Sequence, residues 1–240
     1  QLHRRQRQMC IRDRKYSVFS LIKNAFSNHQ NWEVAWKDPT PKKEYDVVII
    51  GGGGHGLATA YYLAKEHNIR NVAIIEKGWL GGGNVGRNTT IIRSNFMYDA
   101  NARFNEFGMD LWRNLSQELN FNVMFSPRGI INLAHSDAQM NAYARRGNSM
   151  RLNGIDAKLL DRNEVKKLIP MADFSDEVRF PIFGGLMQPS AGTARHDAVA
   201  WGYARQADDM GVDIIQNCEV IGFDVSACLL YTSPSPRDLD

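Results

Sequence analysis

Two short apolar runs and the segment between them dominate the pattern of the first half of the chain. Val47–Ile50 and Val72–Ile75 are continuous apolar runs of four residues, and residues 58–64 between them have helical composition. Runs of this length, rich in valine and isoleucine, predict β-strands. The order strand, helix, strand predicts a βαβ unit with parallel strands.

Further along, apolar residues at spacings of three and four predict a long helix over residues 99–119. Its stripe consists of Phe104, Phe107, Leu111, Trp112 and Leu115, and we expect it to face the core rather than a cofactor. The other predicted elements are strands at 129–134, 180–188, 212–216 and 219–223, and helices at 138–152, 164–169 and from His196 to about residue 210. Asp161 with Glu164 is expected to open the helix at 164–169.

A glycine-rich turn joins the first strand to the first helix. Gly51, Gly53 and Gly56 have the spacing G-x-G-x-x-G, and Glu76 ends the second apolar run about twenty residues later. In dinucleotide-binding units the glycines let the backbone approach a pyrophosphate, the helix start supplies N–H groups, and the acid binds the ribose. The alternative is a glycine-rich loop of another α/β protein. Because all parts occur in order, we predict a Rossmann-type unit.

A second glycine-rich segment, residues 78–95, predicts a long loop. Such loops inside compact domains are usually functional. Arg87, Asn88, Thr89 and Thr90 supply several donors together, suited to a phosphate or the edge of an isoalloxazine ring. Arg93 follows two isoleucines, and we expect it to point inward near the cofactor. The alternative is a solvated loop with a surface arginine.

Composition and charge exclude several classes of function. The net charge is +3, and no basic stripe suggests nucleic acid. No apolar run approaches the eighteen or more residues of a membrane span. Cys10, Cys218 and Cys228 form neither a C-x-x-C pair nor a metal-ligand pattern. We therefore expect a reduced, cytoplasmic protein without a metal site.

The two ends differ from the rest of the chain. Residues 1–14 are basic and 225–240 contain a Ser-Pro-Ser-Pro string; both resemble translated adapter sequence, which predicts artefactual ends on a fragment, against the alternative of a basic arm and a flexible tail. Residues 15–43 form an N-terminal arm with Trp32 and Trp36. The arm could contact a partner subunit or pack on its own domain, and the sequence leaves both open.

Six motifs together resemble one family of flavoproteins. GGGGHGLATAYYLAKEH, EKGWLGGG, GRNTTIIRSN, RLNGIDA, ARHDAVAW and DIIQNCEV are similar to the β subunits of heterotetrameric sarcosine oxidases, in the glycine oxidase and sarcosine oxidase group. The resemblance covers residues 15–223 and implies a Rossmann-type FAD-binding domain, at 44–122 and 192–224. An interleaved α+β substrate domain would include residues 123–191, with the fold incomplete at the C-terminus.

The resemblance also implies an activity. Members bind FAD without a covalent bond, carry FMN on a histidine, and demethylate sarcosine oxidatively to glycine. Electrons pass from FAD to FMN and then to oxygen, which gives hydrogen peroxide. The implied partners are α, γ and δ subunits, with tetrahydrofolate bound through the α subunit.

The residues expected at the flavin sites come from the motifs and the resemblance. His196 is the candidate for FMN attachment, because it stands in ARHDAVAW; an imidazole nucleophile must be neutral. Arg195 and the helix start would disfavour its cation, whereas Asp197 would favour it. The alternative is an ordinary helix-start histidine. The expected cofactor-binding residues are Gly51, Gly53, His55, Gly56, Leu57, Glu76, Lys77, Arg87, Asn88, Thr89, Thr90, Arg93 and Val220, the last through its backbone.

Two other functions stay open at this point. One is an FAD-dependent dehydrogenase of dimethylglycine or sarcosine, which would pass electrons to a carrier. The other is a non-catalytic nucleotide-binding subunit. Phe96 stands where the family commonly has tyrosine, and residues 188–190 lie in a variable segment. No catalytic base or carboxylate clamp can be assigned from the sequence, so the catalytic residues and the exact amine remain unknown.

Overall fold

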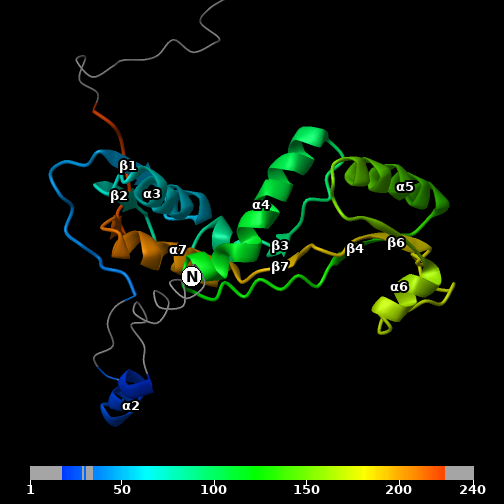
Figure 1. Cartoon of the computed structure of the whole chain (residues 1–240), viewed down its shortest axis with the longest axis horizontal. Helices are drawn as coiled ribbons and strands as arrows, with labels where there is room; N and C mark the ends of the chain where they lie inside the picture. The colour runs from blue at the N-terminus through cyan, green and yellow to red at the C-terminus, as the bar shows by residue number, and fades with distance from the viewer. Residues whose placement is uncertain (1–17, 29, 31–34, 225–240) are drawn as a thin grey trace, which may run out of the picture.

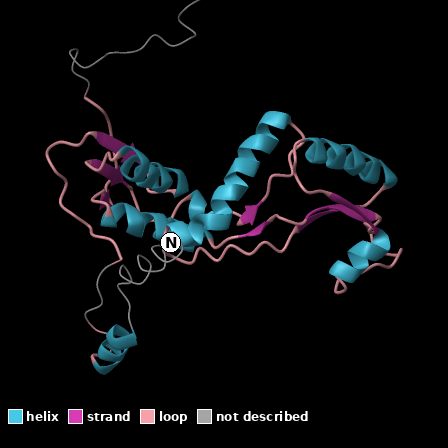
Figure 2. Cartoon of the chain, viewed as in Figure 1, coloured by secondary structure: helices cyan, strands magenta, loops and turns pink. Residues whose placement is uncertain are grey.

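The computed structural model describes residues 18–28, 30 and 35–224. Both predicted artefactual ends and Trp32 of the arm lie outside these residues. Figure 1 shows two layered regions at opposite ends of the molecule, with a long helix and a two-stranded sheet between them. Figure 2 shows helices beside the strands in both regions. The chain is therefore of mixed α/β class, which confirms the predicted class.

The first region is a parallel sheet in the order β1-β2-β8. Strands β1 (Val47–Ile50) and β2 (Val72–Ile75) pair Val47 with Val72, and β2 pairs Ile74 with Ile214 of β8 (Asp213–Ile215). Helices α3 (Gly54–His67) and α7 (His196–Asp209) pack against one another and bury one apolar cluster with the sheet. The predicted βαβ unit is confirmed.

Helix α4 (Asp99–Glu118) joins this region to the second, beside the short strands β3 (Ile91–Ile92) and β7 (Gly192–Thr193) and the 3-10 helix η1 (Asn84–Arg87). The expected core stripe on α4 is only partly correct. Leu115 is buried, but the Phe104 side chain is 76% exposed and Phe107 is also exposed. Only the second half of the helix joins the core cluster of the first region, through Leu115 and its neighbour Trp112. Spacing alone cannot tell which part of an apolar stripe meets a partner.

The second region is an antiparallel sheet in the order β4-β6-β5. Strand β6 (Gly184–Gln188) lies between β4 (Ile130–Ala134) and β5 (Lys158–Asp161), so the predicted strand over 180–188 is shorter than expected and β5 was not foreseen. Helices α5 (Asp137–Leu152) and α6 (Arg162–Leu168) flank it. Asp161 and Glu164 form a reciprocal capping box at the start of α6, as their spacing predicted.

One predicted strand is wrong. Residues 219–223 are extended but pair with no strand in the described part of the chain, and Ile221 is 96% exposed. The backbone does return to the first sheet just before this point, because the Cys218 N–H donates to the Glu76 carbonyl at 3.0 Å. The apolar residues of a strand are present, but a strand also requires a neighbour to accept its hydrogen bonds.

The described end of the arm packs on its own domain. Trp36 packs against the first apolar cluster, the Lys37 N–H donates to Asp208 Oδ1 at 3.0 Å, and the Tyr45 hydroxyl contacts Asp213 Oδ2 at 3.0 Å. Helix α2 (Val18–Phe26), by contrast, exposes Phe19 and Phe26. Among the described helices none has both the length and the hydropathy to cross a bilayer.

Candidate functional site

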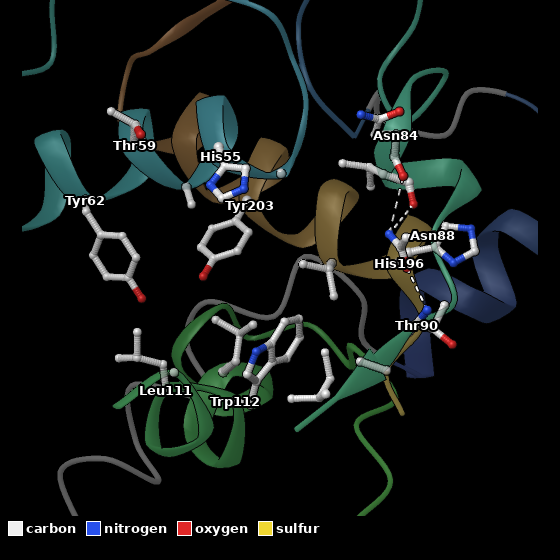
Figure 3. Close-up of a pocket in the computed structure, with 18 of the residues that line it drawn as sticks. His55, Thr59, Tyr62, Asn84, Asn88, Thr90, Leu111, Trp112, His196 and Tyr203 are labelled. Atoms are coloured by element: carbon white, nitrogen blue, oxygen red, sulfur yellow. Dashed lines mark hydrogen bonds between the residues drawn. The ribbon is translucent and has the colours of Figure 1, made fainter. Parts of the chain in front are cut away.

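A cavity of about 830 Å³ lies where the first region meets α4. Helix α3 supplies His55, Thr59 and Tyr62 to its wall, α4 supplies Leu111 and Trp112, and α7 supplies His196 and Tyr203. Figure 3 shows Tyr62 and Tyr203 pointing across the cavity toward Leu111 and Trp112. The segment from Asn84 to Ile92 closes the side next to His196. The cavity therefore has a polar end at the loop and an aromatic end between three helices.

The glycine-rich turn at the start of α3 leaves no room for a side chain at Gly56. A Cβ on Gly56 would lie 2.1 Å from the Gly51 carbonyl oxygen, and Gly51 itself has φ +104°. The Gly53 cap makes no side-chain hydrogen bond, so no side chain occupies the first N–H groups of α3. Bare N–H groups at a helix start suit a pyrophosphate. This turn fits the dinucleotide that its spacing predicted.

Glu76 ties the turn to the end of β2. Its Oε2 accepts from the Gly52 N–H at 2.8 Å, and its Oε1 accepts from the Gly78 N–H at 2.9 Å. Charged acceptors with two backbone donors make strong hydrogen bonds. Glu76 therefore fixes the separation between the glycine turn and the following loop. Its expected hydrogen bond to a ribose stays a prediction.

Asn88 shapes the loop beside the cavity. Its Nδ2 donates to the Val85 carbonyl and its Oδ1 accepts from the Thr90 N–H, both at 2.7 Å. Thr90 has φ +60°, an unusual conformation for a β-branched residue. Asn88, Thr89 and Thr90 all line the cavity. The expectation that these donors gather at one site agrees with their positions, and their contact with a cofactor stays a prediction.

His196 begins α7 at the same wall. Its Nδ1 is buried and has no hydrogen-bond partner among the described residues. The neighbouring charges pair with each other, since Arg195 donates two hydrogen bonds of 2.9 Å to the Asp197 carboxylate. Desolvation acts to raise the pKa of Asp197, but its hydrogen bonds from Arg195 and the Ala198 N–H prevail and lower it. Arg195 and Asp197 therefore form an ion pair beside His196.

The aromatic wall was not foreseen. Tyr62 and Tyr203 meet edge to face with ring centroids 6.2 Å apart, and Tyr61 contacts both. Burial raises the pKa of Tyr203 above the ordinary tyrosine value. The sequence could have predicted Tyr62 at the cavity, because it lies seven residues after His55 and therefore on the same face of the helix. Tyr203 gave no such signal, since its approach depends on how α7 packs on α3.

Five predicted cofactor residues belong neither to the cavity wall nor to the glycine turn that Glu76 holds. The Leu57 side chain is fully buried in the core, whereas Lys77 and Arg87 are exposed on the surface. Val220 belongs to the unpaired extended segment, so its expected place in a strand is wrong. Arg93 turns toward the second region, where it hydrogen-bonds Asn95 and lies over the Phe96 ring at 4.8 Å. The apolar pair before Arg93 predicted its burial but not its direction.

Arg93 belongs to a second polar cluster between the two regions. Arg146 of α5 donates through Nε to the Asn95 carbonyl at 2.8 Å, and burial together with Arg93 lowers the pKa of Arg146. Asn95 and Gln188 are fully buried, and Asn95 Nδ2 has no partner among the described residues. Two guanidinium groups beside an unpaired amide favour an anionic group at this junction. The described residues contain no cluster with the composition of a metal site.

Comparison with known proteins identifies the family. The sequence profile described as FAD dependent oxidoreductase matches residues 46–232. The chain belongs to this family. FAD is therefore the cofactor of the fold, and the bare turn around Gly56 fits it. The family match agrees with the Rossmann-type fold inferred from the glycine spacing.

Three curated relatives with at least 54% identity carry one name. The chain is 62% identical over 208 residues to the sarcosine oxidase subunit beta of Rhizobium meliloti, and 54% identical over 209 residues to that of Rhodobacter capsulatus. Each alignment covers 87% of this chain and 50% of the relative. The resemblance drawn from the six motifs is confirmed, and the chain spans about half the length of these relatives.

A solved structure supports the same fold. L-proline dehydrogenase from P. horikoshii superimposes with a TM-score of 0.70 at 29% sequence identity, over 78% of this chain and 48% of that one. An enzyme named for another amine thus shares this fold. The fold alone therefore leaves the substrate open.

Proposed function

We propose that this flavoprotein chain is part of a sarcosine oxidase β subunit. The observation that carries the proposal is one cavity whose wall contains both the start of α3 and His196. The first suits the pyrophosphate of FAD, and the second is a histidine with a buried, unpartnered ring nitrogen. Bound FAD would supply a two-electron acceptor for the methyl C–H bond of sarcosine.

The residues of the chain would bind, orient and shield the flavins. Gly51 to Gly56 would hold the pyrophosphate, Glu76 the ribose, and Asn88 to Thr90 the polar edge of a ring. The aromatic wall of Tyr62, Trp112 and Tyr203 would exclude water from the cavity. His196 would carry the covalent FMN, with the Arg195–Asp197 pair keeping the local charge balanced. The α, γ and δ subunits and tetrahydrofolate belong to the same proposal through the family resemblance, and the name "subunit beta" of the relatives implies other subunits.

The carboxylate of sarcosine would bind between the parallel-sheet region and the antiparallel-sheet region. Arg93 and Arg146 bring two positive charges close to Asn95, and the unpartnered Asn95 Nδ2 adds a donor. Since β3 lines the cavity and ends at Ile92, this cluster begins one residue beyond the cavity wall. An amino acid held there would present its N-methyl group to the cavity.

Acid precipitation tests whether His196 carries a covalently bound flavin. The chain is co-expressed with the α, γ and δ subunits of the Rhizobium meliloti relative, precipitated with acid, and the flavin left in the pellet is measured. We expect His196→Ala to abolish the covalent fraction and His55→Ala to retain it. If all flavin washes out of the unaltered complex, His196 is not an attachment site.

Peroxide production separates the rival functions. A sarcosine oxidase gives peroxide in proportion to the sarcosine consumed, with dimethylglycine as the weaker substrate. A dehydrogenase that passes electrons to a carrier gives little peroxide without that carrier. An absorbance spectrum without flavin bands would favour the non-catalytic subunit. The identities of 54–62% to proteins named sarcosine oxidase favour the first outcome.

A further inference from the structure

Thr90 has a backbone conformation that its side chain disfavours. Its φ is +60°, in the left-handed region that β-branched residues rarely adopt. Such a conformation persists only where neighbouring groups hold it. Asn88 supplies these contacts, because its Oδ1 accepts from the Thr90 N–H at 2.7 Å and its Nδ2 donates to the Val85 carbonyl of η1, also at 2.7 Å (Figure 3). The side chain of Asn88 therefore links η1 to this conformation of Thr90.

The carbonyl of Thr90 continues this link to the segment before α7. The Ala194 N–H donates to the Thr90 carbonyl at 3.1 Å, and Ile91 pairs with Thr193 where β3 meets β7. Because the two soft dihedral angles of a residue set the direction of its carbonyl group, a change in the conformation of Thr90 would weaken the hydrogen bond to Ala194. Ala194 lies two residues before His196. The conformation of the loop therefore reaches the start of α7.

The imidazole of His196 depends on this backbone for its position. Its Nδ1 is buried and has no hydrogen-bond partner among the described residues, so no such bond holds this nitrogen. The cap residue of α7, Arg195, makes no side-chain hydrogen bond to the start of the helix. The segment that leads into α7 is instead held through its backbone, since the Arg195 N–H donates to the Val123 carbonyl at 3.0 Å and the Ala194 N–H donates to Thr90. The histidine is therefore placed by a segment that Thr90 helps to hold.

We propose that Asn88 is a positioning residue for His196. It holds Thr90 in the left-handed conformation, and the Thr90 carbonyl then fixes the backbone that carries the histidine into the cavity. All three residues line that cavity. The inference rests on the proposed attachment of a flavin at His196, because a reacting ring nitrogen must lie at a fixed place relative to its target. A displacement of about 1 Å can cost roughly a hundredfold in rate. Asn88 acts through Thr90 and takes no part in forming the bond.

Hydrogen exchange in the flavin-free chain tests the structural step. We expect Asn88→Ala to speed exchange of the Ala194 amide at least about threefold, because its acceptor on Thr90 is no longer held. Asn88→Asp keeps an oxygen for the Thr90 N–H and should have a smaller effect. The double variant Asn88→Ala/Thr90→Gly should regain about half of the lost protection or more, since glycine adopts a positive φ readily. Asn114→Ala is the matched control and should leave Ala194 unchanged, because Asn114 also donates to a backbone carbonyl, that of Asp110, but lies on the exposed surface of α4.

The covalent fraction of the flavin tests the functional step. In the complex with the α, γ and δ subunits of the Rhizobium meliloti relative, the acid-stable flavin is divided by the total bound flavin after the same expression time. We expect this ratio to fall at least about threefold in Asn88→Ala and to recover in Asn88→Ala/Thr90→Gly. A residue that only stabilises the fold would lower the acid-stable and the total flavin together, so the ratio would not change.

Three results would overturn the role of Asn88. The exchange of Ala194 could stay unchanged in Asn88→Ala, Thr90→Gly could restore neither the exchange nor the ratio, or the ratio could stay unchanged although the exchange becomes faster. If the unaltered complex holds no acid-stable flavin, the proposed attachment at His196 fails instead. The exchange of Ala194 then decides by itself whether Asn88 positions the segment that carries His196.

Discussion

Both regions of the molecule contain glycines without room for a side chain, but for different reasons. Around α3, the Gly56 backbone lies against the Gly51 carbonyl at the start of a helix that faces the cavity. In the antiparallel sheet, a Cβ on Gly184 would lie 2.4 Å from the Leu160 carbonyl and 2.8 Å from Met140 of α5. The first glycine lets the start of α3 close against the turn and β1, and the second lets a helix approach a sheet. Tight glycines alone therefore do not distinguish a site from a core.

The largest expected effect comes from filling the turn. In Gly56→Ala the new methyl group meets backbone rather than a flexible side chain, so we expect a loss of at least about 3 kcal/mol in the free energy of unfolding. Urea denaturation measures it. Gly54→Ala is the control in the same turn, since its nearest neighbour would be 3.4 Å away. That variant should lie within about 1 kcal/mol of the unaltered chain.

The same substitution in the other region sharpens the comparison. Gly184→Ala should also lose stability, because it meets the Leu160 carbonyl. Its folded fraction should still bind FAD, whereas the folded fraction of Gly56→Ala should not. Flavin absorbance per folded molecule separates the two. Equal flavin content in both variants would mean that the glycine turn has no special role in binding.

The next largest loss of stability is expected at the junction of the two regions. Gln188 is fully buried at the end of β6, donates to Ser94 Oγ at 2.7 Å and accepts from the Ser94 N–H at 3.1 Å. Gln188→Leu leaves both Ser94 groups without these partners, at a cost of about 2–3 kcal/mol. Asn105→Ala, on the exposed surface of α4, should change stability by less than about 0.5 kcal/mol. A Gln188→Leu variant as stable as Asn105→Ala would mean that the regions do not depend on this contact.

The difference between local and distant contacts explains what could be predicted from the sequence. The βαβ unit and the capping box at Asp161 follow from residues close together in the chain, and both are correct. Asn88, Thr89, Thr90 and His196 line one cavity because their motifs lie at strand and helix ends, where side chains converge. Local pattern was sufficient for these features because local geometry determines them.

Features that depend on distant contacts were missed or misjudged. The pairing of β3 with β7 joins Ile91 to Thr193, about a hundred residues apart, over only two residues each. Arg93 turns toward Asn95 and away from the cavity because α5 packs there. The segment 219–223 has the apolar residues of a strand, but no neighbour pairs with it in the described chain. In each case the deciding contact comes from another element.

A smaller effect concerns the aromatic wall, which only the first region has. Burial raises the pKa of both Tyr61 and Tyr203 above the unfolded value near 10. Their folded pKa values are raised, so the stability is fully present below about pH 10 and is lost as the pH rises further. We expect a decline of about 1.4 kcal/mol per pH unit for each tyrosine. Tyr203→Phe should reduce this slope between about pH 10 and 11, and Tyr98→Phe, at an exposed position, should not.

The smallest effect tests whether the second region is stabilised by local contacts alone. Asp161 accepts from the Glu164 N–H at 2.8 Å, and Glu164 accepts from the Asp161 N–H at 2.9 Å. Asp161→Ala removes one of these bonds and should cost about 1 kcal/mol, whereas Asp161→Asn keeps a capping oxygen and should cost less. Neither change should alter flavin content, because α6 lies at the far end of the molecule from the cavity (Figure 1). Flavin loss in Asp161→Ala would instead show that the antiparallel region holds the cofactor site in place, and the two regions would then form a single cooperative unit.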